Sequence, residues 1–223
     1  MVKSIRTLTV FYDTEISVKE IPLFRGAVIK SLGDKANVLY HNHTGEKTFR
    51  YSYPLIQYKR LNGKAAITCV EEGVDLVGRI LSELCGTILI GNREERIAVE
   101  KVVPSKEEVQ ISESLFVYKL HQWLPLNSKN YELYQNTEEL IERIKILERI
   151  LTANILSFLK GVEIHLEKQL LIHITDILGQ KVITYKDVKL MAFDIKFKTN
   201  INLPVNIGIG KNASVGNGVL TKT

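Results

Sequence analysis

The 223-residue sequence contains little cysteine, tryptophan or methionine, and it lacks any long apolar run. Two cysteines, Cys69 and Cys85, are too few for a disulfide framework, so we expect a reducing, cytoplasmic location. Apolar runs of only a handful of residues argue against a membrane-spanning helix, and residues 1–6 show no apolar segment of a secretion signal. A hydrophobic share of 45% and a charged share of 25% are typical of a globular protein rather than a disordered one.

Charge is distributed unevenly along the chain. The 30 Lys and Arg against 25 Asp and Glu give a formal net charge of +5. Residues 1–64 hold eleven basic and five acidic side chains, residues 65–179 hold twelve and eighteen, and residues 180–223 hold seven and two. The basic ends predict an anion-binding surface assembled from both of them, although solvated faces would give the same pattern.

Hydrophobic periodicity in the first half predicts the order strand, helix, strand, strand, helix, strand, which is typical of a ferredoxin-like fold. The Asn62-Gly63 pair predicts a tight hairpin turn between the two middle strands. We expect a helix over residues 22–32 and another over 74–84. The expected strands cover residues 5–13, 49–59, 64–70, 87–90 and 96–102.

The second half predicts another α+β unit, and we place the boundary in a linker at residues 103–112. A capping signal, Asn136-x-x-Glu139, predicts the start of the longest helix, over residues 137–159. Its core stripe should comprise Leu140, Ile144, Leu147, Leu151, Ile155 and Leu159. The expected strands cover residues 114–124, 163–167, 169–175, 181–185 and 189–198. The fold class is therefore α+β, with two tandem ferredoxin-like (RRM-type) domains, 1–105 and 106–223, and a C-terminal glycine-rich loop.

The glycine-rich segment at residues 208–218 is the most distinctive local feature. A dinucleotide-binding fingerprint does not fit, because no acidic residue follows at the required distance, and a P-loop does not fit either. A loop lined by backbone amides with one lysine suits a nucleic-acid backbone, whereas a plain hairpin of small residues is the simpler alternative. The preceding strand turns two lysines away from its apolar face. The candidate RNA-binding residues of this region are Lys196, Lys198, Gly208, Gly210, Lys211, Gly216 and Gly218.

His41 and His43 are the best catalytic candidates, because histidine titrates near pH 6.5 and a pair can supply both a base and an acid. Two polar loop histidines would be the simpler interpretation. We expect no metal site, since the further donors that zinc requires are scattered. The next strand interleaves basic and aromatic side chains, which suits phosphate contact and base stacking, or simply a strand packed in the core: Arg50, Tyr51, Tyr53 and Lys59.

Several segments together resemble one known family. They come in family order: Arg25-Gly26, residues 39–43, residues 49–59, residues 154–161, residues 192–200 and residues 208–218. In combination they resemble the CRISPR-associated endoribonucleases that process precursor guide RNA, the sixth-numbered Cas family of the RAMP superfamily, in its b subgroup. The resemblance extends from about residue 20 to the end of the chain. Asn217 departs from it, because the family usually has an aromatic or aliphatic residue between the last two glycines.

This resemblance implies metal-independent cleavage of CRISPR repeat RNA in precursor crRNA, without a cofactor. The 2′-hydroxyl attacks the neighbouring phosphate and leaves a 2′,3′-cyclic phosphate and a 5′-hydroxyl. The resemblance also implies that His41 and His43 carry out proton transfer, with Lys30, Tyr51 and Tyr53 as further catalytic candidates. Its implied partners are repeat RNA, subunits of the interference complex and a second copy of the chain. The alternative is a non-catalytic subunit that binds crRNA within such a complex.

Overall fold

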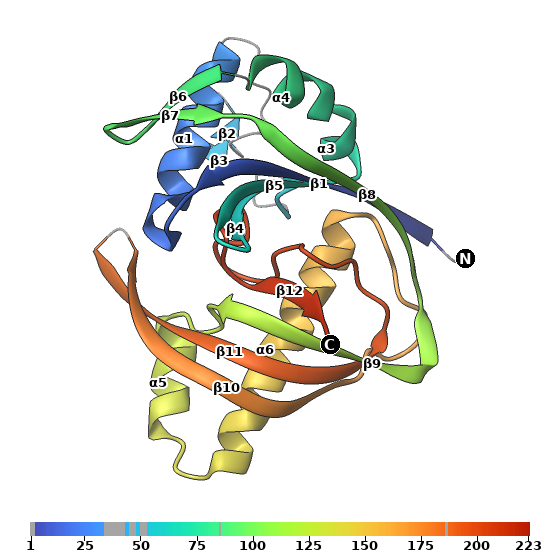
Figure 1. Ribbon diagram of the computed structural model, residues 1–223. Helices are drawn as coiled ribbons and strands as arrows, with labels where there is room; N and C mark the ends of the chain where they lie inside the picture. The colour runs from blue at the N-terminus through green and yellow to red at the C-terminus, as the bar shows by residue number, and fades with distance from the viewer. Residues whose placement is uncertain (1–2, 34–42, 45–47, 50–52, 85, 186) are drawn as a thin grey trace. The chain divides into compact units, whose positions relative to one another are not determined.

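The computed structural model describes residues 3–33, 43–44, 48–49, 53–84, 86–185 and 187–223, with only the backbone of 43–44 and 48–49. These residues form two compact units (Figure 1). The N-terminal unit comprises Ser4–Glu107 together with Ser214–Gly216, and the C-terminal unit comprises Lys3, Glu108–Ala213 and Asn217–Thr223. The end of the chain therefore contributes to both units. Among the described residues, no helix is long and apolar enough to cross a membrane.

The N-terminal unit is built on a sheet with strand order β4-β5-β1-β8. Along the chain, the elements follow the ferredoxin-like order, in which α1 (Ile21–Leu32) connects the first two strands and α3 (Glu72–Asp75) with α4 (Val77–Glu83) precedes the last. A short 3-10 turn, η1 (Val18–Glu20), leads into α1. The four strands are β1 (Lys3–Glu15), β4 (Ile56–Leu61), β5 (Lys64–Val70) and β8 (Val99–Val109).

Three aromatic rings join α1 to this sheet. Phe24 of α1 lies between Tyr12 of β1 and Tyr58 of β4, with ring centroids 5.9 and 6.1 Å apart, and all three side chains are fully buried. Such edge-to-face contacts add to the stabilisation from burial of the ring surface. At the other end of β4, Asn62 and Gly63 both have positive φ, which confirms the predicted tight turn into β5.

The N-terminal unit differs from the sequence prediction in three places. The expected helix over 74–84 is two short helices. Within the expected strand over 49–59, Phe49 belongs to a separate short strand, residues 53–55 lie outside any strand, and β4 begins at Ile56. The linker expected at 103–112 was wrong: β8 runs to Val109, and β9 (Ile111–Trp123) starts two residues later. The burial of residues along β8 alternates as in a strand, but its mostly polar composition concealed this strand in the sequence. Two small hairpins complete the unit: β2 (His43–Thr44) with β3 (Thr48–Phe49), and β6 (Gly86–Ile90) with β7 (Arg93–Ile97).

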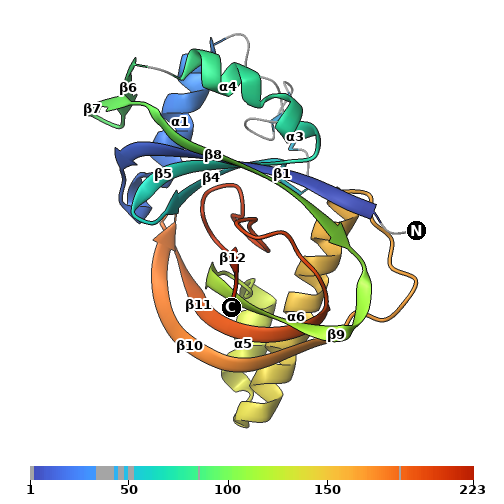
Figure 2. The ribbon, with the colours of Figure 1, turned by 45° about the vertical axis from the view of Figure 1, so that its right-hand side comes forward.

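The C-terminal unit repeats the same topology with strand order β10-β11-β9-β12, and α5 and α6 lie on one face of its sheet (Figure 2). Residues 202–218, which include the glycine-rich segment, stand where the second helix of a ferredoxin-like unit would be. Besides β9, the elements are α5 (Ser128–Asn136), α6 (Leu140–Gly161), β10 (Ile172–Tyr185), β11 (Val188–Ile201) and β12 (Val219–Lys222). Both halves thus confirm the predicted α+β class and tandem ferredoxin-like fold.

The long helix begins later than predicted. Asn136 ends α5 instead of capping α6, and Glu139 is the N-cap of α6. Leu140 is 63% exposed and Ile144 is only half-buried, whereas the rest of the predicted stripe, from Leu147 onward, is buried. Residues 163–167 form a loop and not a strand, and the two strands expected within 169–185 are the single strand β10.

Candidate nucleic-acid interface

The histidine pair lies at the edge of what the structure describes. His43 belongs to β2, where its backbone pairs with Phe49 of β3, while His41, Arg50 and Tyr51 lie outside the described residues. Lys30 is exposed in the last turn of α1. The β2–β3 hairpin therefore leads directly from His43 to the aromatic and basic segment.

Among the described residues of the predicted catalytic set, Tyr53 makes a side-chain hydrogen bond to its own segment. Its hydroxyl accepts from Nε2 of Gln57 at 2.8 Å, and the same amide group donates to the carbonyl of Pro54 at 2.9 Å. Burial raises the pKa of Tyr53 above its ordinary value, so the phenol is protonated at physiological pH. Gln57 thereby fixes the segment before β4 to the strand itself, and Tyr53 can act as a donor but not as a base.

Lys59 corrects the sequence interpretation. It was expected on an RNA-contacting strand, but its side chain is fully buried, and its Nζ has no hydrogen-bond partner among the described residues. Burial lowers the pKa of Lys59 to about 7. Because Tyr58 faces α1, Lys59 and Gln57 face the opposite side of β4, where Thr68 is also buried and its hydroxyl lies 3.3 Å from that of Thr9. Lys59 thus does not offer its charge to a phosphate at the surface.

The glycines of residues 208–218 are required by internal packing. A Cβ on Gly208 would lie 2.8 Å from the carbonyl oxygen of Ala213, and one on Gly218 would lie 2.0 Å from that of Ile209. A Cβ on Gly210 would meet Oδ1 of Asn154 at 2.6 Å. Gly210 and Gly218 also have positive φ, 90° and 63°. Close approach within the protein therefore explains these glycines without any ligand.

A hydrogen bond to β9 and another within the segment itself hold the same residues in place. The Gly218 amide donates to the carbonyl of Gln122 at 3.2 Å, and the Ile209 amide donates to that of Gly218 at 2.7 Å. Behind the segment, the buried indole Nε1 of Trp123 donates to Oδ1 of Asn154 at 2.9 Å. Asn217, the departure from the family pattern, is only 7% exposed. The segment is thus a fixed platform rather than a loose loop.

Part of this segment belongs to the N-terminal unit. The Tyr58 amide donates to the carbonyl of Ser214 at 2.9 Å, and Tyr58 forms a parallel bridge with Val215. Gly216 lies against α1, because a Cβ there would sit 2.6 Å from Cδ1 of Ile21. The three residues therefore contact the edge strand β4 through an isolated bridge.

The lysine-bearing face of β11 is confirmed by its pairing. Phe193 packs against Tyr134 of α5, with centroids 5.8 Å apart, so the alternate residues Lys196 and Lys198 face away from the helices. Lys196 is paired with Lys119 of β9 on one side and with Asp176 of β10 on the other. Directly opposed like charges repel, and an anion between Lys119 and Lys196 would relieve that repulsion. Lys119 was missed in the sequence, although its alternation with Tyr118 and Leu120 marks it.

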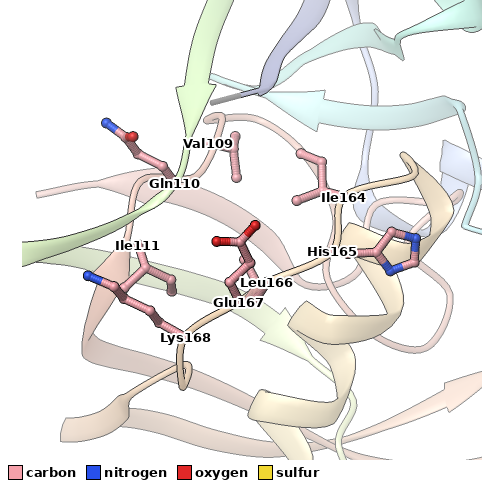
Figure 3. Close-up of a pocket in the computed structure, with 8 residues that line it drawn as sticks. All are labelled: Val109, Gln110, Ile111, Ile164, His165, Leu166, Glu167 and Lys168. Atoms are coloured by element: carbon pink, nitrogen blue, oxygen red, sulfur yellow. The ribbon is translucent and has the colours of Figure 1, made fainter. Parts of the chain in front are cut away.

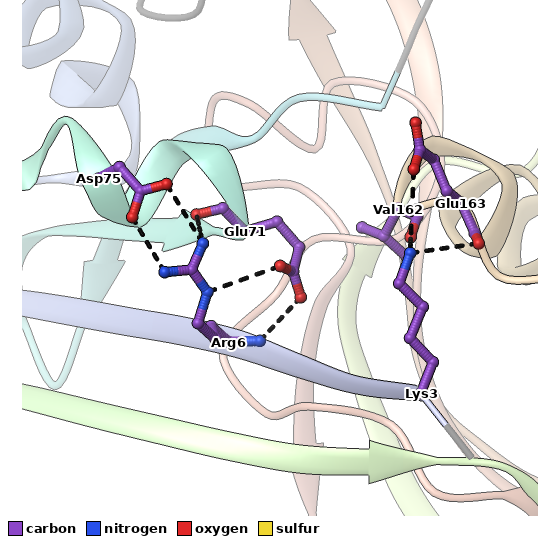
Figure 4. A network of polar contacts seen from close by, with 6 residues as sticks. All are labelled: Lys3, Arg6, Glu71, Asp75, Val162 and Glu163. Atoms are coloured by element: carbon purple, nitrogen blue, oxygen red, sulfur yellow. Dashed lines mark hydrogen bonds and ion pairs between the residues drawn. The ribbon is translucent and has the colours of Figure 1, made fainter. Parts of the chain in front are cut away.

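Several basic residues of the N-terminal region are used within the protein. Arg6 donates to both carboxylate oxygens of Asp75, at 2.9 and 3.2 Å, and holds the pKa of that carboxyl below its ordinary value (Figure 4). Lys3 donates to the carbonyls of Val162 and Glu163 at the end of α6, at 2.9 and 3.3 Å. These cations stabilise local structure, so the basic count of residues 1–64 overstates the charge free to meet RNA.

A small pocket lies where residues 109–111 meet the loop 164–168 (Figure 3). Its polar side chains include His165 and Glu167, but the His165 ring points away from the carboxylate of Glu167. His173 does have a carboxylate partner: its Nδ1 lies 3.2 Å from Oε1 of Glu148. Both histidines were expected within apolar strands, but His165 lies in a loop and is exposed. Neither shows a catalytic arrangement.

Comparison with known proteins identifies relatives of the whole chain. The family model for the Cas6b N-terminal domain matches residues 3–108, and the model for the Cas6b C-terminal domain matches residues 110–223. The protein MJ0978 of Methanocaldococcus jannaschii is 35% identical over 116 residues, which are 50% of this chain and 76% of that protein.

Two crystal structures show the same fold over 99% of this chain and 100% of theirs. One is a Cas6b structure with a TM-score of 0.88 and 26% identity, and the other is a CRISPR RNA processing endoribonuclease Cas6b with a TM-score of 0.75 and 23% identity. The resemblance first seen in scattered motifs is confirmed, because both family models match in order and together span nearly every residue: the chain belongs to the Cas6b family.

Proposed function

We propose that this chain is a metal-independent endoribonuclease that cleaves CRISPR repeat RNA in precursor crRNA. The observation that carries the proposal is the match to both Cas6b domains in order, from residue 3 to residue 223. A CRISPR RNA processing endoribonuclease is among the structures with this fold. The lysine-bearing face of β11 and the fixed glycine platform with Lys211 give such an enzyme a surface for the RNA backbone.

The proposed reaction needs no metal, because the attacking group is the 2′-hydroxyl of the substrate. The protein supplies orientation, proton transfer and stabilisation of charge on the phosphorane. His41 and His43 serve as base and acid, and the products carry a 2′,3′-cyclic phosphate and a 5′-hydroxyl. Lys30, Tyr51 and Tyr53 position the phosphate, and the neutral Tyr53 does so as a hydrogen-bond donor.

The RNA path in this proposal follows lysines that the structure leaves accessible, together with Arg50, which lies outside the described residues. Lys196, Lys198 and Lys211 contact phosphates, as does Arg50, which precedes the catalytic tyrosines. Of the four candidate glycines of the platform, Gly210 and Gly216 are partly exposed and would approach the RNA backbone, whereas Gly208 and Gly218 are buried and would maintain the shape of the platform. A second copy of the chain and subunits of the interference complex are the protein partners that this role would bring.

The test is cleavage of a CRISPR repeat RNA in excess chelator. We expect product with the wild-type protein and none when the scissile nucleotide carries a 2′-deoxy substitution. Replacing His41 and His43 together by alanine should slow cleavage by about 10²- to 10⁴-fold for each proton transfer that is lost. The matched control replaces His165, an exposed histidine in the loop 163–167, which should leave the rate unchanged.

Two other outcomes would overturn parts of this proposal. A strict requirement for a divalent metal would exclude the mechanism. Tight binding of repeat RNA without product at any time, and without an effect of the histidine substitutions, would instead identify a non-catalytic crRNA-binding subunit.

A further inference from the structure

A groove lies within the C-terminal unit where α5 begins beside the far end of the β10–β11 hairpin. β11 pairs with β9 only from Phe193 onward, whereas it pairs with β10 as far as Val188. The hairpin therefore extends beyond the rest of the sheet (Figure 1). The ring of Tyr134 on α5 contacts Phe193 of β11, which holds α5 against one face of these strands. The groove between them has a volume of about 350 Å³.

The groove combines an apolar interior with a basic rim. Leu126, which is buried, and Met191, which is half-buried, line it together with Tyr131, which is 44% exposed. Lys189 from β11 and Lys211 from the glycine segment are both exposed and line the same groove. Neither ammonium group is engaged in an ion pair with any of the described residues.

These features match the parts of a single nucleotide. Aromatic rings stack on unpaired bases, and lysines hold the phosphates that flank them. A volume of about 350 Å³ is at the lower end of the range for small-ligand pockets, which suits one nucleotide better than a larger body. Glu132 also lines the groove, and its carboxylate can accept a hydrogen bond from the N3–H of uracil or from the exocyclic amine of cytosine or adenine.

We propose that this groove binds one unpaired RNA nucleotide, with its base against Tyr131 and its flanking phosphates on Lys189 and Lys211. The inference deepens the proposed function and rests on it, because it takes RNA as the ligand. It adds a base-stacking position that is separate from the histidine region. A base within a duplex could not reach the Tyr131 ring, so the groove selects a single-stranded part of the substrate.

The test measures binding of a fluorescently labelled eight-nucleotide oligouridylate by anisotropy. Tyr131→Leu should weaken binding about tenfold or more, since it removes the aromatic face, whereas Tyr131→Phe should keep wild-type affinity. A second probe is an abasic oligonucleotide of the same length. Its affinity should be the same for Tyr131→Leu and the wild type, because it has no base to stack.

The lysines are tested by the dependence of affinity on salt. Lys189→Ala and Lys211→Ala should each reduce the slope of log K against log salt by about 0.7 for both probes. Lys129→Ala, an exposed change on α5 outside the groove lining, is the matched control and should keep the slope. Equal binding of oligouridylate by the wild type and Tyr131→Leu, or an equal loss on both probes, would overturn the proposal.

Failure of this inference differs from failure of the proposed function. If the wild-type protein cleaves repeat RNA while Tyr131→Leu binds oligouridylate normally, the groove is not a nucleotide site. If the wild-type protein leaves repeat RNA intact but its binding of oligouridylate depends on Tyr131, the endoribonuclease function fails and the groove stands. Absence of any wild-type binding to oligouridylate overturns the groove.

Discussion

The buried lysine on β4 makes a prediction at the level of a single side chain. Its pKa is about 7 in the folded protein and near 10.4 in the unfolded chain, so the unfolded state binds the extra proton between these values. Stability should therefore rise with pH across this window. Lys59→Met removes the titrating group, and it should raise the melting temperature at pH 7, with a gain that shrinks as the pH approaches 10.

The measurement is thermal denaturation of both proteins at several pH values between 6 and 10. Since one pKa unit corresponds to about 1.4 kcal/mol, the pH-dependent part of the gain should reach a few kcal/mol. Lys106→Met changes an exposed lysine and should show no such dependence. A gain for Lys59→Met that is the same at every pH would show that the ammonium group is not desolvated.

The sequence could not reveal the position of Lys59. Alternation along residues 56–61 correctly separates Tyr58 from Lys59, but it does not say whether both faces of a strand are covered. The residue types of His41 and His43 indicate acid–base chemistry. The relative positions of their side chains cannot be predicted from their spacing in the sequence. The hydrogen bond from Gln57 to Tyr53, four residues apart, depends on the backbone between them.

At the scale of elements, the glycine platform predicts which substitutions it tolerates. Gly218→Ala should lower the free energy of unfolding by at least about 2 kcal/mol, because its Cβ meets a backbone oxygen at 2.0 Å and its φ is positive. Gly26→Ala on α1 meets nothing within 4 Å and lies within a helix. It should stabilise the protein by about 0.5–1 kcal/mol. Chemical denaturation of both variants measures the contrast, and equal effects would contradict the packing described.

Elements with strong periodicity were predictable, and those with weak periodicity were not. β1, α1 and β5 follow from alternation, helical spacing and the Asn62-Gly63 turn. α5 escaped notice because only Tyr134 on it is buried, so no apolar stripe marks it. Its last residue, Asn136, then resembled the cap of α6. Residues 103–109 of β8 were taken as part of a linker because its alternating residues are mostly polar.

For the whole molecule, the distribution of charge predicts how salt controls RNA binding. Lys196→Ala and Lys198→Ala should each reduce the slope of log K against log salt for single-stranded repeat RNA by about 0.7. Lys145→Ala is the control, because this lysine lies on α6 beside Glu142, on the helix-covered side of the sheet. Filter binding at several salt concentrations gives the slopes, and equal slopes in all three variants would remove the β11 face from the interface.

The formal net charge of +5 says less about the class of binding partner than the positions of the charged side chains do. Several basic side chains of residues 1–64 make contacts within the protein. Arg6 donates to Asp75, and Nε of Arg60 donates to the carbonyl of Ile16. In the last 44 residues, by contrast, Lys196, Lys198 and Lys211 make no ion pair with the described residues. Both basic regions can be located in the sequence. Only the structure distinguishes basic side chains that bond to other parts of the protein from those that make no ion pair with the described residues.

Residues 214–216 also have a consequence for the order in which the protein matures during synthesis. The N-terminal unit includes Ser214–Gly216, which follow the 106 residues Glu108–Ala213 of the other unit. Until the ribosome has released these three residues, the Tyr58 amide lacks the carbonyl to which it donates in the finished protein. The first unit to be translated is therefore completed only after residues 108–213 of the other unit have been made, and a chain truncated before residue 214 leaves both units defective.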